Sequence, residues 1–318
     1  MNYIDSINYY GKNQIPFIFL IDFLAQKPLV LAFDQITDDF LFDFNGFKNF
    51  VEPPKNNKKL VFEKNPISFE IYKKKFEIVQ KHILYGNSFL VNLTQATPIH
   101  TNFTLSEIFY QSQATYKLLW KDNFVFFSPE SFVQIKENQV ATFPMKGTID
   151  ANLPSAESII LNDSKEAAEH ATIVDLLRND LSQIAQNISV EKYRYIEKIQ
   201  NNQKNLLQVS SKIIGTLPPN FRNNLGEIIT KLLPAGSISG APKKKTLDII
   251  KEAENYERGY FTGIAGYFDG NNLDSCVMIR FIEQKNGLFF KSGGGITANS
   301  IAQNEYQELI DKVYVPIF

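Results

Sequence analysis

Residues 123–135 have the sequence NFVFFSPESFVQI, and this segment indicates how the middle of the chain folds. Two runs rich in aromatic and β-branched residues, 123–127 and 131–135, have the composition of strands. The tripeptide Ser128-Pro129-Glu130 between them predicts a turn. We therefore expect antiparallel strands mixed with helices rather than repeating βαβ units.

The flanking segments extend this pattern. Residues 68–85 predict a helix, because apolar residues recur there at near-helical spacing. A strand is predicted at 89–94, and two strand-like runs, 17–21 and 29–33, dominate the first fifty residues. Residues 52–59 contain two prolines and a run of Lys and Asn, which is typical of a linker, so we place the main boundary there.

Composition narrows the class of protein. The chain has 318 residues, for which roughly two domains are expected, although one large α+β domain is also admissible. The 33 basic and 34 acidic residues give a formal net charge of −1, which provides no overall field to gather nucleic acid or an anionic membrane. No segment predicts a signal peptide or a membrane span, and a single cysteine excludes an internal disulfide. We expect a soluble, cytoplasmic protein.

The predicted helix 164–184 carries a candidate metal ligand. Asp163 and Glu166 have capping-box spacing at its start, and Glu169 lies near the edge of its apolar stripe. Glu169 could form an ordinary surface pair with Lys165, or it could face inward and require a partner or a metal, and the pattern leaves both open. His170 is expected to be a packed or half-exposed histidine rather than a ligand.

The C-terminal helix offers further carboxylates. Ser300 is expected to cap it, and Glu305 and Glu308 share one side, with Lys312 four residues beyond Glu308. Alone, this pattern favours a solvated face with an ion pair. Oxygen ligands of this kind also suit Mg²⁺, provided that this helix converges with the helix that carries Glu169.

Four other segments bear on the chemistry. Residues 289–296 run as a strand into Gly293, Gly294 and Gly295, which either form a tight turn or present amides to an anion. Residues 234–245 have the texture of a phosphate loop but not its spacing, so we exclude a nucleotide site. Lys146, between Pro144 and Gly147, is either an exposed turn lysine or a nucleophile. Arg280, in an apolar strand, is expected to have an anionic partner.

Together these segments resemble the chorismate-utilising enzyme family from about residue 66 to the C-terminus. The matching segments are 144–148, 168–181, 236–243, 258–259, 279–280, 293–295 and 305–308, with Lys312. The resemblance implies an α+β fold of two facing, mainly antiparallel sheets flanked by helices, with the active site between the sheets. It also implies a catalytic domain at 61–318 and a shortened, β-rich N-terminal segment at 1–60 packed on it.

The resemblance further implies the ligands of the site. Glu169 and Glu308 would hold Mg²⁺, with help from Glu305, and the metal would bridge to a carboxylate of chorismate. The remaining substrate contacts would come from Gly147, Thr148, Ser239, Phe261, Arg280, Gly293, Gly294, Gly295 and Lys312. The leaving group needs an acid, and Gln208 stands where much of the family has a histidine.

Within the family, Lys146 is the discriminating residue. It is similar to the lysine of the aminodeoxychorismate synthase branch, which attacks the chorismate ring before ammonia enters. This implies conversion of chorismate and ammonia to 4-amino-4-deoxychorismate, the precursor of 4-aminobenzoate and folate. The alternatives are anthranilate synthase component I, which typically has alanine there, and a non-catalytic chorismate-binding scaffold.

The lone cysteine bears on the ammonia supply. Hydrolysis of glutamine by the usual amidotransferases needs a cysteine nucleophile, and Cys276 lies in an apolar strand. We therefore expect a separate glutaminase subunit as a partner, with free ammonia as its substitute.

Overall fold

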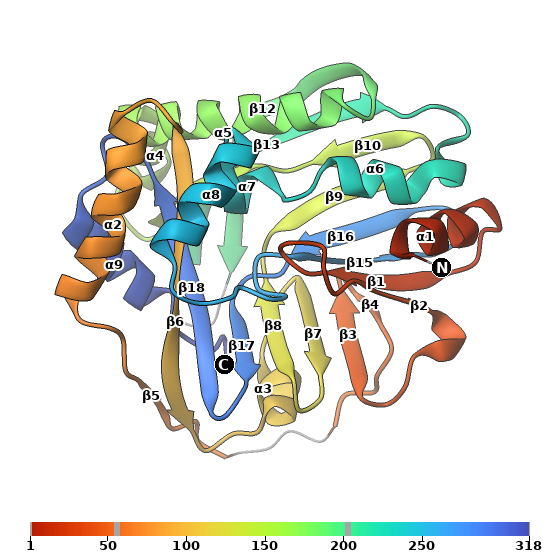
Figure 1. Ribbon diagram of the computed structural model, residues 1–318, viewed down its shortest axis with the longest axis horizontal. Helices are drawn as coiled ribbons and strands as arrows, with labels where there is room; N and C mark the ends of the chain where they lie inside the picture. Colours follow the sequence, from red (N-terminus) through yellow and green to blue (C-terminus); the bar gives the residue numbers. More distant parts are fainter. Residues whose placement is uncertain (1, 54–57, 201–204, 318) are drawn as a thin grey trace.

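A computed structural model describes residues 2–53, 58–200 and 205–317, and two nine-stranded sheets form its framework (Figure 1). The sheets face each other, and helices flank them, which confirms the expected α+β class. Every strand pairing among the described residues is antiparallel, as expected for the middle of the chain.

The first sheet, sheet A, has the strand order β11-β13-β10-β9-β16-β15-β1-β2, and β12 also pairs with β13. Its strands are β1 (Phe17–Ile21), β2 (Leu29–Ala32), β9 (Ser131–Lys136), β10 (Gln139–Thr142), β11 (Met145–Asp150), β12 (Gln186–Gln200), β13 (Asn205–Thr216), β15 (Ile264–Phe268) and β16 (Leu273–Val277).

The second sheet, sheet B, has the order β14-β6-β18-β17-β8-β7-β3-β4, and β5 pairs with β6. Its strands are β3 (Phe40–Phe44), β4 (Phe47–Lys48), β5 (Phe62–Lys64), β6 (Leu90–Thr101), β7 (Tyr116–Trp120), β8 (Phe124–Ser128), β14 (Gly240–Ala241), β17 (Phe281–Gln284) and β18 (Leu288–Ile296).

The helices include all three of the predicted segments, two of them with closely matching ends. They are α1 (Tyr3–Lys12), α2 (Phe69–Leu84), α3 (Leu105–Gln111), α4 (Ala156–Asn162), α5 (Ser164–Ser182), α6 (Leu225–Lys231), α7 (Gly236–Ser239), α8 (Lys243–Ala253) and α9 (Ala302–Asp311). Asp163 caps α5 by accepting a hydrogen bond from the Glu166 amide. The predicted cap of the C-terminal helix is wrong, because Ile301 stands at that position and Ser300 Oγ instead accepts from the Thr297 amide.

The segment 123–135 forms both predicted strands, but they are not neighbours. β8 lies in sheet B between β7 and β17, whereas β9 lies in sheet A between β10 and β16. Ser128-Pro129-Glu130 therefore carries the chain from one sheet to the other. This crossing brings Glu130 into the space between the sheets.

The N-terminal residues contain a helix that the apolar pattern did not predict. α1 packs on α6, and the chain approaches its neighbours so closely that a Cβ on Gly11 would lie 2.4 Å from Arg222 O. Farther along, β1 and β2 belong to sheet A, and β3 and β4 belong to sheet B. The boundary near residue 60 thus does not separate the sheets, and it stays a prediction about the extent of the catalytic part. Residues 54–57 of the predicted linker lie outside the described residues.

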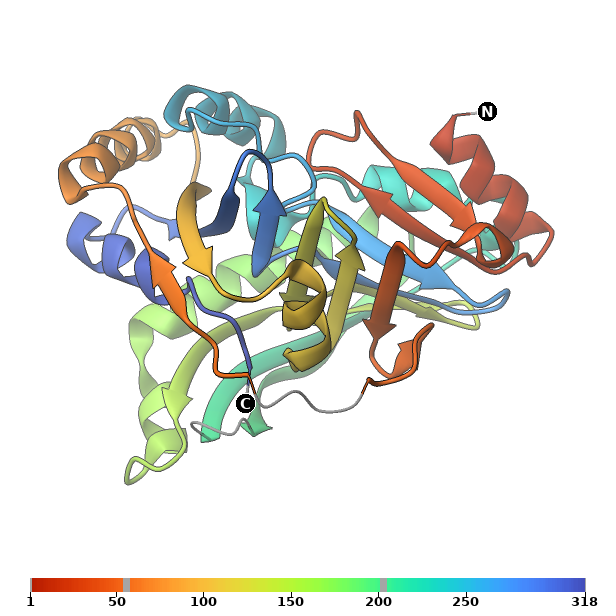
Figure 2. The same cartoon turned by 90° about the horizontal axis from the view of Figure 1, so that it is seen from below.

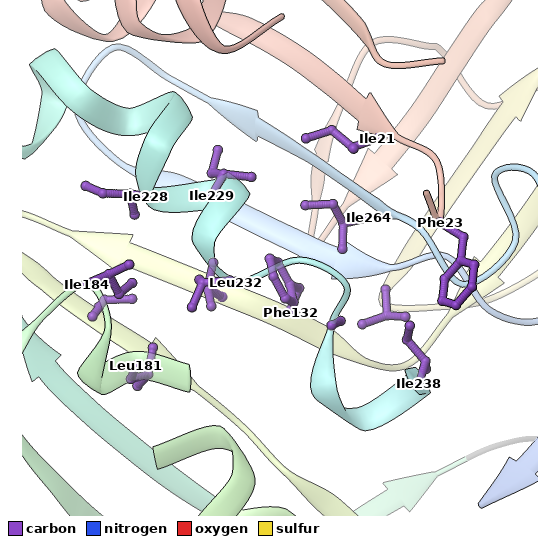
Figure 3. Close-up of a cluster of buried hydrophobic side chains, with 14 of the residues drawn as sticks. Ile21, Phe23, Phe132, Leu181, Ile184, Ile228, Ile229, Leu232, Ile238 and Ile264 are labelled. Carbon is purple, nitrogen blue, oxygen red and sulfur yellow. The ribbon is translucent and has the colours of Figure 1, made fainter. Parts of the chain in front are cut away.

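A buried apolar cluster joins sheet A to the helices packed on it (Figure 3). It includes Ile21, Phe132 and Ile264 from the sheet, Leu232 after α6, and Ile238 from α7. Each fully buried side chain of this kind contributes roughly 1.5–3 kcal/mol. The cluster supports the wall that carries the residues described below.

A view from below shows the two ends of the molecule (Figure 2). α1 and the strands β1–β4 lie at one end, and α2, α8 and α9 lie at the other, in agreement with the first view (Figure 1). Within the described residues, no helix combines the length and apolar character needed to span a membrane.

Candidate active site

A cavity of about 640 Å³ lies between the two sheets. Its walls come from β9, β10, β11 and β16 of sheet A, from β6 and β18 of sheet B, and from α5, α7 and α9. Because both sheets contribute, residues far apart in sequence line the same cavity.

Nine of the fourteen site residues predicted from sequence line this cavity. These are Lys146, Glu169, Phe261, Arg280, Gly293, Gly294, Gly295, Glu308 and Lys312. The other five do not belong to its described lining, namely Gly147, Thr148, Gln208, Ser239 and Glu305. The structure thus brings together the charged residues of four separate motifs.

Lys146 lies near the start of β11, at the edge of sheet A, where a bulge shifts the register with β13. Its Nζ is 2.8 Å from Glu169 Oε2. Burial lowers the pKa of Lys146, but the carboxylates of Glu169, Glu166 and Glu308 outweigh burial and leave the pKa raised. These carboxylates therefore favour the ammonium form of Lys146.

Two helices each present a pair of glutamates, three residues apart, towards Lys146. Glu166 and Glu169 come from α5, and Glu305 and Glu308 come from α9. A Cβ on Gly294 would lie 3.6 Å from Glu305 Oε2 and 3.7 Å from Glu308 Oε1, so both α9 carboxylates reach the glycine triplet. Burial, reinforced by the neighbouring carboxylate, raises the pKa of Glu166 and of Glu305.

Carboxylate oxygens such as these are suitable ligands for a divalent cation. Glu166 Oε2 is buried without a hydrogen-bond partner among the described residues. The lysine ammonium groups partly balance the charge, since Lys312 Nζ lies 2.6 Å from Glu308 Oε1 and Lys146 pairs with Glu169. Within the described ranges, no three acidic, His or Cys side chains are grouped closely enough to bind a metal. A cation here would take one or two carboxylates, with substrate and water completing its shell, as Mg²⁺ prefers.

The basic side of the cavity consists of Arg280 and Lys312. The prediction that Arg280 lies within a strand is wrong, because it falls between β16 and β17 with a left-handed φ of 53°. Its Nη1 donates to Lys312 O at 3.1 Å, and its guanidinium lies 4.9 Å from the centre of the Tyr314 ring. Lys312 Nζ donates to Gly293 O at 2.9 Å. Two cations held in place beside an open cavity can bind carboxylates.

The glycine triplet continues β18 instead of ending it. Its residues pair with β6 through Gly295 opposite Asn92, and a Cβ on Gly293 would lie 2.5 Å from Leu93 O. The described β17 pairs with β18 as far as Lys291, so the triplet has one free ladder side. The close approach of β6 explains why glycines stand at these positions. The amides on the unpaired side of the strand are available to bind an anion.

Glu130 is a cavity residue that the sequence pattern did not reveal. It lies at the crossing between the sheets and accepts a hydrogen bond from Ser237 Oγ. Burial raises the pKa of Glu130 above the usual range for a glutamate, against the opposing effects of Ser237 and Lys312. A carboxyl that keeps its proton can serve as an acid. The sequence signal was a lone acidic residue after proline between two apolar strands.

The five residues outside the lining have other surroundings. Gln208 lies on β13, paired with Thr148 on one side and Glu197 on the other. Ser239 Oγ donates to Ala235 O, whereas its neighbour Ser237 faces the cavity. Gly147 has a φ of +83°, and a Cβ there would lie 3.1 Å from Glu166 Oε2. Glu305 lies close to Gly294, since its Oε2 would be 3.6 Å from a Cβ there.

Two further residues match their expectations. His170 is buried, its Nε2 lies 2.7 Å from Ser211 Oγ, and burial lowers its pKa to about 4, so it is a packed neutral histidine. Cys276 is buried in β16, and burial raises the pKa of its thiol. A thiolate nucleophile is therefore disfavoured at this position.

Comparisons with known proteins show which family the chain resembles. The profile of the family described as chorismate binding enzyme matches residues 29–317, which extends the resemblance upstream of residue 66. An uncharacterized PabA-like protein of Haemophilus influenzae is 50% identical over 99% of this chain and 97% of its own. Aminodeoxychorismate synthase component 1 of Escherichia coli is 32% identical over 77% of this chain and 56% of its own. The crystal structure of anthranilate synthase component I from Streptococcus pneumoniae superposes with a TM-score of 0.66 at 29% identity, covering 85% of this chain and 61% of that one.

Proposed function

The chain belongs to the chorismate-binding enzyme family, and from this premise we propose that it is the component that aminates chorismate to 4-amino-4-deoxychorismate. The reaction would use ammonia and Mg²⁺ and would serve synthesis of 4-aminobenzoate and folate in the cytoplasm. The observation that carries the proposal is the position of Lys146, whose amine reaches into the cavity beside Glu169. The relative named aminodeoxychorismate synthase component 1 supports the same reaction.

The cavity residues divide into a binding set and a reacting set. Arg280, Lys312 and the outward amides of the glycine triplet would hold the substrate carboxylates. Phe261 is buried in the wall and offers an apolar face to the ring. A Mg²⁺ ion on the carboxylates would supply positive charge that orients a substrate carboxylate and favours the neutral amine of Lys146.

Two proton-dependent steps would follow. Lys146 would first lose a proton to solvent. Its neutral Nζ would then form a bond to the ring while the bond between the ring and the 4-hydroxyl breaks, and the hydroxyl would leave as water with a proton from Glu130. Ammonia would then form the new carbon–nitrogen bond, Lys146 would depart with the bonding electrons, and the surplus proton would pass to solvent or to Glu130. We assign the acid role to Glu130 instead of Gln208, because Glu130 lines the cavity and Gln208 lies outside its lining.

Mass analysis of the products tests the proposal. The purified chain is incubated with chorismate, Mg²⁺ and ammonium, and 4-amino-4-deoxychorismate is the expected product. Anthranilate would instead support the second candidate, anthranilate synthase component I, which is also the name of the structural relative from Streptococcus pneumoniae. Binding of chorismate without any product would point to a non-catalytic scaffold.

Glutamine should not replace ammonium for the chain alone. The single cysteine is buried with a raised pKa, which disfavours a glutaminase nucleophile, and we propose a separate glutaminase subunit as the partner. Incubation with chorismate, Mg²⁺ and glutamine is expected to give no aminated product, while ammonium restores it. Amination from glutamine by the purified chain would refute the need for a partner.

Binding of Mg²⁺ should depend on Glu308. Glu308→Gln is expected to weaken Mg²⁺ binding on the order of tenfold or more, because one charged oxygen ligand is lost. Calorimetric titration of Mg²⁺ with chorismate present measures the effect. Asp311→Asn is the matched control, since Asp311 lies on the same helix, is exposed and accepts from Gln307 Nε2. Equal Mg²⁺ affinity in the Glu308→Gln variant and the wild type would contradict this assignment.

A further inference from the structure

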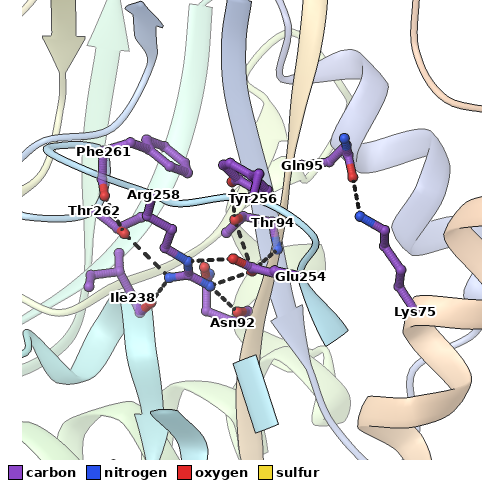
Figure 4. Close-up of polar contacts among 10 residues, drawn as sticks. All are labelled: Lys75, Asn92, Thr94, Gln95, Ile238, Glu254, Tyr256, Arg258, Phe261 and Thr262. Carbon is purple, nitrogen blue, oxygen red and sulfur yellow. Dashed lines mark hydrogen bonds and ion pairs between the residues drawn. The ribbon is translucent and has the colours of Figure 1, made fainter. Parts of the chain in front are cut away.

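Arg258 belongs to a motif that the site described above does not use. It is 4% exposed, and all five of its N–H groups are engaged within the protein (Figure 4). Nε and Nη2 donate to the two carboxylate oxygens of Glu254 at 2.9 Å and 2.6 Å. This is the two-point geometry that arginine forms with a carboxylate and that lysine cannot reproduce.

The other N–H groups of Arg258 hold three residues of the cavity wall. Nη2 donates to Asn92 O at 2.6 Å, and Nη1 donates to Ile238 O at 3.0 Å and to Thr262 Oγ1 at 3.3 Å (Figure 4). All three acceptor residues line the cavity, whereas Arg258 itself does not belong to its described lining. Arg258 therefore acts on the cavity through its neighbours.

These three wall residues come from different parts of the fold. Asn92 lies on β6 of sheet B, Ile238 lies on α7, and Thr262 directly follows Phe261 and leads into β15 of sheet A. One guanidinium thus links a strand of sheet B, a helix and the segment that leads into sheet A. Phe261, which we assign to the ring of the substrate, directly precedes Thr262 and accepts a hydrogen bond from Thr262 Oγ1 at its carbonyl oxygen (Figure 4).

Glu254, which binds the guanidinium of Arg258, is itself held in place by hydrogen bonds. Glu254 Oε1 also accepts from the amide and the hydroxyl of Thr94, at 2.7 Å and 2.9 Å, and the side chains of Arg258 and Glu254 are 2% and 1% exposed. The Phe23 ring covers one face of the guanidinium, with its centre 4.5 Å away. Arg258 O accepts from Lys291 Nζ at 2.9 Å, and Lys291 is another wall residue. The guanidinium consequently has one well-defined position.

We propose that Arg258 is a positioning residue that sets the placement of Asn92, Ile238 and Thr262 around the chorismate ring, with Glu254 as its anchor. The proposal rests on the proposed chorismate site and adds to it a residue that does not touch substrate. Misplacement of reacting groups by about 1 Å can cost about 10²-fold in rate, so small shifts of this wall matter.

Arg258→Lys provides the first test. Lysine keeps the positive charge but cannot replace the five N–H donors of arginine. We expect kcat/KM for chorismate to fall on the order of 10²-fold, and calorimetry to show weaker binding of chorismate. The control is Lys117→Met, which removes another buried cation, one that donates to Phe109 O and Ser112 O away from the cavity. The control should lower the melting temperature but leave the kinetic constants of the folded enzyme within about twofold of wild type.

A double variant separates positioning from stability. Arg258→Met with Glu254→Met removes the buried pair without leaving a lone charge, a change that is often tolerated. We expect its melting temperature to exceed that of Arg258→Lys, while its chorismate affinity and kcat/KM stay impaired. If either folded variant binds and converts chorismate like the wild type, Arg258 is structural and the proposal is overturned.

Product analysis tests the proposed reaction, whereas calorimetry of chorismate binding tests the role of Arg258, so the two proposals can fail separately. Absence of 4-amino-4-deoxychorismate from wild-type reactions would refute the amination reaction, but the calorimetric comparison of chorismate binding would still decide the role of Arg258. Normal amination by wild type with unchanged constants in the variants would refute the role of Arg258 alone.

Discussion

Lys146→Ala is expected to lower kcat for amination of chorismate by about 10³-fold or more, because the variant has no nucleophile to attack the ring. Mg²⁺-dependent binding of chorismate should stay nearly intact, since Arg280, Lys312 and the glycine triplet remain in place. The measurement pairs steady-state kinetics under saturating ammonium with calorimetric titration of chorismate. A parallel loss of kcat and kcat/KM at constant affinity is the signature of an interaction made only during reaction.

Lys165→Ala is the matched control for Lys146. Lys165 also lines the cavity and pairs with Glu169, but its Nζ is 3.8 Å from Glu169 Oε1 and its side chain is 54% exposed. Exposed pairs of this kind contribute roughly 0–1 kcal/mol, so the rate should change by a few fold at most. If Lys146→Ala weakened chorismate binding as much as it slowed turnover, Lys146 would be a ground-state contact and not the nucleophile.

Glu130→Gln is expected to lower kcat by about 10²–10⁴-fold, the usual contribution of a positioned general acid. Glutamine preserves the size of the side chain and can still accept from Ser237 Oγ, but it cannot give a proton to the leaving hydroxyl. Chorismate binding should therefore change little. Glu137→Gln, an exposed glutamate in the turn between β9 and β10, is the control and should behave as wild type.

The pH dependence of kcat gives a second measure of Glu130. Burial raises the pKa of Glu130, and an acid acts in its protonated form, so activity should fall as the pH rises through that raised pKa. The hydrogen bond from Ser237 lowers the pKa of Glu130. Ser237→Ala should thus move the alkaline limb to higher pH, and Glu130→Gln should abolish it. An unchanged alkaline limb in the Glu130→Gln variant would assign that limb, and the acid role, to another group.

Local sequence patterns were sufficient for elements whose signals are short-range. Helix α5 follows its capping residue Asp163, and β1 coincides with a five-residue apolar run at 17–21. Helix α1 also has a capping residue, since the Asn2 side chain accepts a hydrogen bond from the Asp5 amide, but the apolar pattern did not predict this helix. Its packing on α6 and the close approach at Gly11 are contacts that the chain alone does not show. The cap at Ser300 was wrong for a similar reason, since Ser300 forms its bond with the preceding turn.

The residues of the candidate site also fall into those that the sequence could identify and those that it could not. Charged residues inside recognisable motifs, such as Lys146, Glu169 and Arg280, could be named from the sequence. Glu130 could not, because two strands separated by three residues can form a hairpin or enter different sheets, and its character depends on which of these occurs. Gln208 was named from the resemblance to the family, whereas in the structure it pairs with Glu197 and Thr148 and is not among the residues that line the cavity.

By itself, the sequence determined the mixed antiparallel class, the family and most of the charged residues of the site, because these depend on residue type and on spacing along the chain. The tertiary structure alone decided which of those charges meet. It surrounded Lys146 with carboxylates, carried Glu130 between the sheets and gave Arg258 its five hydrogen bonds. The physical reason is that a pKa or a complete hydrogen-bond set depends on distances through space and on burial, and both exist only once the two sheets have packed.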